Sequence, residues 1–208
     1  MYKNILFDAD GTLLDTIDGI HAAFNYARNK QGEPLFTREQ VKPFIGPTLM
    51  DTLHNTLGYP LDEATEGVKI YREFYWDKGY KMCDLYPGIK QLLKDLKQAG
   101  KKLCVATNKA QPFIDMILKE KGIFKYFDLV VGPDLITTST DKTPLVKKAI
   151  LSSPAVMVGD RYIDIVAAKN NDIDSIGVNW GSAEEGEFIK YGATHVVSSV
   201  SEIYTLCV

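Results

Sequence analysis

The sequence has few of the features that mark disulfide-stabilised, zinc-binding or membrane-spanning proteins. Its three cysteines, Cys83, Cys104 and Cys207, are far apart and include no C-x-x-C pair, so neither a disulfide framework nor a zinc site is indicated. We therefore expect reduced thiols and a cytoplasmic protein. No apolar run reaches the length of a transmembrane helix. The N-terminus lacks the apolar region and small-residue cleavage site of a signal peptide.

An excess of charge of one sign is also missing. There are 24 Lys and Arg against 27 Asp and Glu, which gives a formal net charge of −3. Without a basic face or a polybasic stretch, we expect neither a nucleic acid nor an anionic membrane as a partner. The 208 residues, 45% of them hydrophobic, suit one mid-sized domain or a core with a small insert.

Short apolar runs predict the strands of a parallel sheet that is buried on both faces. These runs are residues 2–7, 102–107, 126–131, 155–158, 175–178 and 195–197. Helical patterns alternate with them from residue 86 onward, over residues 88–100, 111–122, 143–151, 162–170 and 183–191. This alternation predicts an α/β fold with a doubly wound, Rossmann-like parallel sheet.

One region breaks the alternation and predicts an inserted domain. Between residues 18 and 80 the periodicity is helical and no convincing strand is present. The helices are expected over residues 17–30, 37–41, 48–57 and 61–78, separated by segments that contain Gly and Pro. We predict that residues 1–16 and 81–208 form the α/β core and that residues 17–80 form an all-helical cap.

Polar side chains stand at or near the ends of three predicted strands. They are Asp8 and Asp10, Thr107 and Asn108, and Asp160. Asp164 follows Asp160 by about one helical turn, and Lys142 precedes the helix over residues 143–151. Because ligands of open α/β sheets bind beyond the carboxyl ends of the strands, we expect these groups around one cleft.

The charges of this set indicate a cation and a phosphorylated substrate. Carboxylates held close together repel one another unless a cation or a proton intervenes. Mg²⁺ satisfies them with oxygen ligands and suits a bound phosphate. The Lys142 ammonium and the Thr107 hydroxyl would serve an oxyanion, and a carboxylate can act as the nucleophile in phosphoryl transfer.

Four motifs in this order make the sequence resemble the haloacid-dehalogenase-like hydrolases. The motifs are residues 8–12 (DADGT), residues 107–109 (TNK), Lys142 and residues 159–164 (GDRYID). The segment 85–88 (LYPG) is also similar to that family. The resemblance covers essentially the whole chain, and the spacing of all four motifs makes it more specific than any one alone.

The resemblance implies a role for each matched residue. Asp8 would attack phosphorus and carry the phosphoryl group. Asp10 would give a proton to the leaving oxygen and then take one from water. Thr107 and Lys142 would hold the phosphoryl oxygens, and Asn108 would touch the substrate or the phosphate.

The resemblance also implies the metal ligands and a mobile cap. Mg²⁺ would be bound by Asp8, by the backbone carbonyl of Asp10 and by Asp160. Asp164 would act through a water or through Lys142, and both possibilities stay open. The helical cap would close over the site and exclude water, and its Gly46, in the loop 44–47, is a candidate for substrate specificity.

Several neighbouring residues compete for these roles or depart from the pattern. Ala9 stands where a bulkier apolar residue is common, at a position where only the backbone is expected to act. Lys147 and Lys148 compete with Lys142, but they fall inside a predicted helix and are expected to be solvated. Arg161 is expected to face solvent, and we leave it out of the site.

The cap pattern is similar to phosphoglycolate phosphatases and to the related 5′-nucleotidases. It implies a monomeric or homodimeric phosphomonoesterase for a small phosphorylated metabolite, with Arg72 as a second candidate contact for an anionic group. A β-phosphoglucomutase-type mutase is less favoured, because such mutases place a His where Ile20 stands and His21 is one residue later. A dehalogenase is disfavoured by Asp10, and the complete motif set argues against a regulatory protein on an inactive core.

Overall fold

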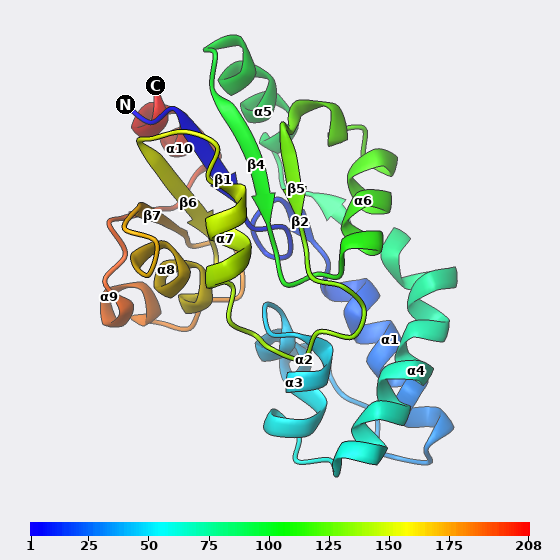
Figure 1. Ribbon diagram of the computed structural model, residues 1–208. Coiled ribbons are helices and arrows are strands. Elements are labelled where there is room, and N and C mark those ends of the chain that lie inside the picture. Colours follow the sequence, from blue (N-terminus) through cyan, green and yellow to red (C-terminus); the bar gives the residue numbers. More distant parts are fainter.

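The computed structural model describes residues 1–208 and contains a six-stranded, entirely parallel sheet in the order β5-β4-β1-β6-β7-β8 (Figure 1). The strands are β1 (Asn4–Phe7), β4 (Lys102–Ala106), β5 (Leu129–Val131), β6 (Ala155–Gly159), β7 (Asp174–Val178) and β8 (His195–Val197). The predicted doubly wound α/β fold is thus confirmed. The chain builds the sheet outward in both directions from β1, so β1 lies at the topological switch point.

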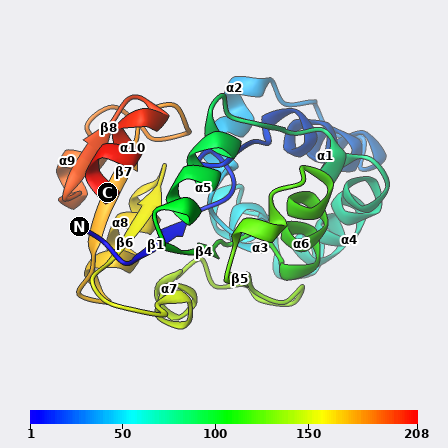
Figure 2. The same ribbon diagram turned by 90° about the horizontal axis from the view of Figure 1, so that it is seen from above.

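Helices cover both faces of the sheet because successive strand residues point to opposite sides. Ile5 and Phe7 belong to the larger core cluster, whereas Leu6 belongs to a second cluster on the other face. On the first face lie α5 (Ile89–Gln98), α6 (Gln111–Glu120) and α10 (Val200–Cys207). On the second lie α7 (Thr143–Ala149) and α8 (Tyr162–Lys169), with α9 (Glu187–Tyr191) beside α8. Figure 2 shows α5 and α7 on opposite sides of the strands.

The helical segment between the first and second sheet strands packs around a separate apolar cluster, to which Phe113 of α6 also belongs. Its helices are α1 (Ile17–Lys30), α2 (Arg38–Val41), α3 (Leu49–Asp51), which continues as a π-helical turn over Thr52–Thr56, and α4 (Leu61–Asp77). Phe24 of α1 meets Tyr71 of α4 edge-on with ring centroids 5.1 Å apart. We call residues 17–80 the helical insert; Figure 1 shows it beyond the carboxyl ends of the strands. The exact domain boundaries stay a prediction.

Four elements differ from the sequence-based expectation. The antiparallel pair β2 (Leu14–Asp15) and β3 (Asp84–Leu85) joins the two chain segments that lead into and out of the helical insert. Two residues are too few to show a periodicity, so these strands could not be predicted from the sequence. The helix α10 was also missed, and α9 begins at Glu187 rather than near residue 183, after Gly186 in a left-handed conformation. No helix of the structure is both long and apolar enough to cross a membrane.

Candidate active site

Three neighbouring strands bring the predicted site residues to one edge of the sheet. Asp8 directly follows β1, Thr107 follows β4 and Asp160 follows β6. Because β1 lies between β4 and β6, these carboxyl ends are adjacent. Lys142 immediately precedes α7, at the end of the long connection from β5. The fold therefore assembles groups that are up to 152 residues apart, as between Asp8 and Asp160.

Lys142 lies between two carboxylates. Its Nζ is 2.9 Å from Asp8 Oδ1 and 2.6 Å from Asp164 Oδ1, and all three side chains are buried. Burial disfavours the ammonium, but the Asp164 and Asp8 carboxylates outweigh burial and raise the pKa of Lys142 above its usual range. The competing Lys147 and Lys148 are exposed on α7. The geometry therefore places Lys142, and neither competitor, beside Asp8.

Asp8, Asp160 and Asp164 form a buried carboxylate cluster, with one oxygen from each within 4.8 Å of the others. Burial and then the charges of Asp8 and Asp164 raise the pKa of Asp160 well above its usual range. Burial likewise raises the pKa of Asp164 to about 6. The Lys142 ammonium supplies one positive charge for three carboxylates. This all-oxygen set fits a hard divalent cation, which would relieve the remaining repulsion.

Local contacts hold Asp160 in place. The Thr12 hydroxyl donates to Asp160 Oδ1 at 3.2 Å, and the backbone N–H of Ser182 donates to Asp160 Oδ2 at 2.8 Å. Gly11 has a φ of +79°, and a Cβ there would lie 2.1 Å from Asp160 Oδ2. The glycine in the DADGT motif thus lets the loop after β1 approach the carboxylate.

The Asp10 side chain points to a partner that the sequence analysis missed. Asp10 Oδ2 lies 3.0 Å from Lys109 Nζ, and both side chains are largely buried. Asp10 Oδ1 is buried without a hydrogen-bond partner. The predicted set of metal ligands was Asp8, Asp10 and Asp160, of which Asp10 was assigned through its backbone carbonyl. The Asp10 side chain is not part of the carboxylate cluster, and metal binding through its carbonyl stays a prediction. The only sequence signal for Lys109 was its place directly after Thr107 and Asn108.

Thr107 and Asn108 both line the cleft beside Asp8. The Thr107 hydroxyl accepts from the backbone N–H of Lys109 at 3.2 Å. Asn108 Nδ2 donates to the carbonyls of Gly46 and Thr140 at 3.0 Å each, and Asn108 Oδ1 has no partner. Asn108 therefore bridges the helical insert and the segment before Lys142. Its predicted contact with the substrate stays a prediction.

The loop that contains Gly46 rests on Arg161, and the expectation that Arg161 faces solvent is wrong. Arg161 is 7% exposed and pairs with Glu187 at 3.2 Å. Its Nη1 donates to the Ile45 carbonyl of the helical insert at 2.7 Å. The Arg161 side chain packs under Gly46, which has a φ of +110°. No sequence pattern indicated Glu187 as the buried partner of Arg161.

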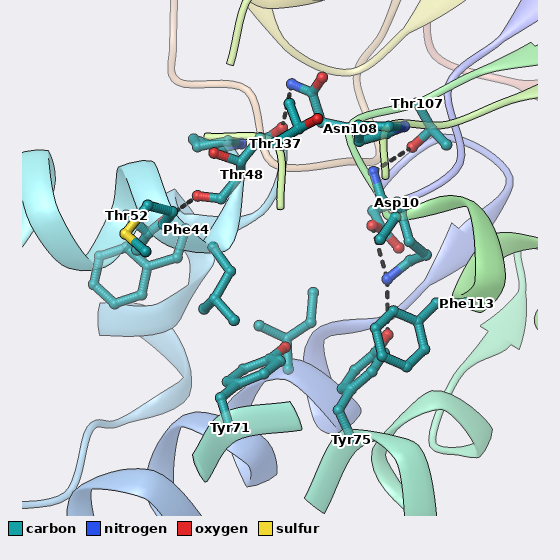
Figure 3. Close-up of a pocket in the computed structure, with 18 of the residues that line it drawn as sticks. Asp10, Phe44, Thr48, Thr52, Tyr71, Tyr75, Thr107, Asn108, Phe113 and Thr137 are labelled. Carbon is teal, nitrogen blue, oxygen red and sulfur yellow. Dashed lines mark hydrogen bonds and ion pairs between the residues drawn. The ribbon is translucent and has the colours of Figure 1, made fainter. Parts of the chain in front are cut away.

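A cleft between the core and the helical insert leads to Asp8 and Asp10 (Figure 3). The space that its residues line, including open solvent at the mouth, amounts to about 830 Å³. The wall formed by the insert is largely apolar and includes Phe44, Tyr71 and Tyr75. Figure 3 shows Tyr71 and Tyr75 along one helix of the insert, with Asp10 across the cleft from Tyr75.

Arg72 also lines the cleft, and its Nη2 donates to the Leu135 carbonyl at 2.6 Å. Burial lowers the pKa of its guanidinium below the usual range. Gly46 lines the cleft as well. The structure thus places both candidates for substrate contact on the wall that the helical insert forms.

Comparison with known proteins establishes the class to which this fold and site belong. The chain belongs to the haloacid dehalogenase-like hydrolase family, which it matches over residues 5–178. A predicted phosphatase from Clostridium acetobutylicum has a similar crystal structure, with a TM-score of 0.93 and 33% identity, covering 99% of this chain and 98% of that one. The family recognised from the four motifs is thereby confirmed.

Relatives with assigned names point to phosphate chemistry. The chain is 32% identical to a phosphoglycolate phosphatase of Vibrio parahaemolyticus, over 97% of this chain and 94% of that protein. It is 32% identical to a 5′-nucleotidase of Pseudomonas aeruginosa, with the same coverage. It is also 34% identical to the tyrosine-protein kinase PtkA of Mycobacterium tuberculosis, over 96% of this chain and 69% of that protein. Phosphatase as the predicted enzyme class is confirmed by the family and by the phosphatase-named relatives.

Proposed function

We propose that this protein is a Mg²⁺-dependent phosphomonoesterase that hydrolyses a small phosphorylated metabolite through an aspartyl-phosphate. The observation that carries the proposal is the buried Asp8 carboxylate, held 2.9 Å from the Lys142 ammonium at the edge of a three-carboxylate cluster. A carboxylate in such surroundings is positioned and charge-compensated for attack on a phosphoryl group. The phosphatase-named relatives support the same chemistry.

The reaction has two steps. A carboxylate oxygen of Asp8 forms a bond to phosphorus while the bond from phosphorus to the leaving alcohol breaks, and Asp10 gives its proton to that alcohol oxygen. A water oxygen then forms a bond to phosphorus and gives a proton to Asp10, while the bond from phosphorus to the Asp8 oxygen breaks, which releases inorganic phosphate and restores Asp8. Asp10 therefore acts as general acid in the first step and as general base in the second. It is protonated again at the end of each cycle.

Other residues bind and orient the phosphoryl group. The Thr107 hydroxyl and the Lys142 ammonium are the donors for its oxygens. Asp8, Asp160 and the Asp10 carbonyl would hold Mg²⁺, which neutralises charge on the phosphate when bound. Asp164 acts through Lys142, to which it lies closest. The helical insert serves as the cap that excludes water during the transfer.

The substrate candidates differ in what their leaving groups require. Phosphoglycolate carries a second anion, for which Arg72 is a candidate cation in the cleft. A nucleoside monophosphate is the second candidate, because Phe44, Tyr71 and Phe113 line the cleft and aromatic side chains can stack on a base.

A mutase gains no support, since the His21 ring is hydrogen-bonded to the Phe36 carbonyl. The buried free cysteines agree with a cytoplasmic location, and we expect a monomer or homodimer.

A phosphate-release screen with Mg²⁺ over phosphoglycolate, nucleoside monophosphates and sugar phosphates tests the proposal. Asp8→Asn should abolish release from every substrate, because an amide cannot form the aspartyl-phosphate, while circular dichroism shows the native fold. Asp15→Asn is the matched control, since Asp15 is an exposed carboxylate of the same segment, and it should retain activity. Full activity of Asp8→Asn, or transfer of phosphate from ATP to tyrosine in place of hydrolysis, would refute the proposal.

A further inference from the structure

Lys109 joins the Asp10 carboxylate of the core to a tyrosine of the helical insert. Lys109 Nζ lies 3.0 Å from Asp10 Oδ2 and donates to the Tyr75 hydroxyl at 2.7 Å. The ammonium also lies 4.9 Å from the centroid of the Tyr75 ring. Figure 3 shows the two interactions as a chain from Asp10 to Tyr75. Tyr75 belongs to α4, so one buried lysine contacts both walls of the cleft.

Lys109 Nζ is buried between the Asp10 carboxylate and the Tyr75 hydroxyl. The side chain of Lys109 is only 6% exposed. Any movement of the insert that withdraws Tyr75 would remove one of the two oxygens that hold this buried charge.

The two oxygens of Asp10 have different environments. Oδ2 is held by Lys109, whereas Oδ1 is buried without a partner. Lys109 therefore fixes the carboxyl group through one oxygen, and no protein group competes for the other. Orientation of this kind is a large part of what positioned general acids contribute.

We propose that Lys109 is a positioning residue that couples the helical insert to Asp10. With Tyr75 in contact, Lys109 holds Asp10 Oδ2 and presents Oδ1 for proton transfer. When the insert moves away, Lys109 loses its contact with Tyr75 and the orientation of Asp10 relaxes. Proton transfer is thereby favoured with the cleft closed over a substrate. This inference rests on the proposed function, since it assigns Lys109 a role only through Asp10.

Two substrates separate this role from a general loss of activity. Departure of an alkyl alcohol needs the proton from Asp10, whereas p-nitrophenolate is a stable anion that departs without one. The ratio of kcat/KM for the two phosphates therefore reports proton donation, and the concentration of active enzyme cancels in it. The alkyl phosphate is the one that is hydrolysed fastest in the phosphate-release screen.

Lys109→Met should lower kcat/KM for the alkyl phosphate by roughly 10–100-fold, part of the usual contribution of a general acid. For p-nitrophenyl phosphate we expect a loss of less than about threefold. Tyr75→Phe removes only the hydroxyl and should change the ratio in the same direction by roughly 2–10-fold. Tyr26→Phe is the matched control, because it removes the hydroxyl of another tyrosine of the insert that does not line the cleft, and its ratio should equal that of the wild type.

A double-mutant comparison tests whether Lys109 acts through Asp10. In an Asp10→Asn background, Lys109→Met should cause no further change in the ratio, because residues that act as one unit are not additive. Equal losses with both substrates, or an undiminished effect of Lys109→Met in the Asp10→Asn background, would overturn the inference. If the wild-type enzyme shows no Mg²⁺-dependent hydrolysis at all, the proposed function fails instead, so the two failures are distinguishable.

Discussion

The two walls of the cleft are held in place by different kinds of interaction. On the core wall, Asp8 and Asp160 follow adjacent strands of a parallel sheet. The buried Lys142 ammonium lies 2.9 Å from Asp8 and neutralises part of the negative charge. The opposite wall meets the core through hydrogen bonds to the carbonyls of Ile45 and Gly46 and to the Tyr75 hydroxyl. Phe113 of α6 also packs edge-on against Tyr75, with ring centroids 4.9 Å apart. The buried carboxylate cluster thus belongs to the core wall, whereas the wall of the insert contributes mainly apolar side chains. We expect changes in the core wall to remove the chemistry and changes in the other wall to adjust it.

The largest effect should come from Lys142→Met. It removes the cation between Asp8 and Asp164, and loss of one phosphate donor alone typically lowers kcat by about 10²–10³-fold. Because Lys142 also restrains the nucleophile, we expect a loss of at least about 10³-fold in Mg²⁺-dependent hydrolysis. The unpaired buried carboxylates should also lower the free energy of unfolding by about 3–5 kcal/mol.

Lys147→Met is the control for this change, because Lys147 is exposed on the same helix. It should leave both the rate and the unfolding midpoint close to those of the wild type. A Lys142→Met protein that is folded and retains a tenth of the wild-type rate would break the contrast between the walls, since the core wall would then tolerate loss of its central charge.

The second effect concerns the carboxylate cluster without metal. Asp160 and Asp164 have a raised pKa in the folded protein, about 6 for Asp164, whereas unfolded Asp titrates near about 3.9. The folded state therefore binds more protons than the unfolded state between these values. Stability of the metal-free protein should fall as the pH rises from about 4 through 6, by on the order of 1–3 kcal/mol.

Thermal unfolding in a chelator, measured between pH 5 and 7.5, checks this trend. Added Mg²⁺ should raise the midpoint most at the high end of this range, because it binds the ionised cluster. Asp160→Asn should flatten the pH dependence and abolish the response to Mg²⁺. A metal-free midpoint that rises steadily with pH over this range would contradict the assignment of a repulsive cluster.

The same contrast explains how much could be predicted from the sequence. The core wall is built from strand ends, and short apolar runs followed by Asp8, Thr107 and Asp160 report strand ends directly. Contacts between the walls join residues far apart in sequence, either through backbone carbonyls, which every residue has, or through single side-chain contacts such as that of Lys109 with Tyr75. No pattern could therefore announce that Lys109 reaches Tyr75, or that Arg161 is buried under Gly46. The pair β2 and β3 escaped for a simpler reason, because two residues are too few for a periodicity.

The smallest effect should come from Gly46→Ala, on the wall of the insert. Gly46 has a φ of +110°, which L-residues rarely adopt, and a Cβ would approach Arg161 Cγ to 3.1 Å. We expect a loss of stability of about 1–2 kcal/mol from the backbone and a rise in KM of a few fold, with kcat changed by less than about threefold. Gly58→Ala is the matched control: its φ is +76° and its Cβ would meet nothing within 4 Å. It shares the backbone cost but lies outside the cleft, so its KM should be unchanged. If both variants change KM equally, the effect of Gly46 would reflect the stability of the insert, and its place beside Arg161 and the cleft would not matter for substrate binding.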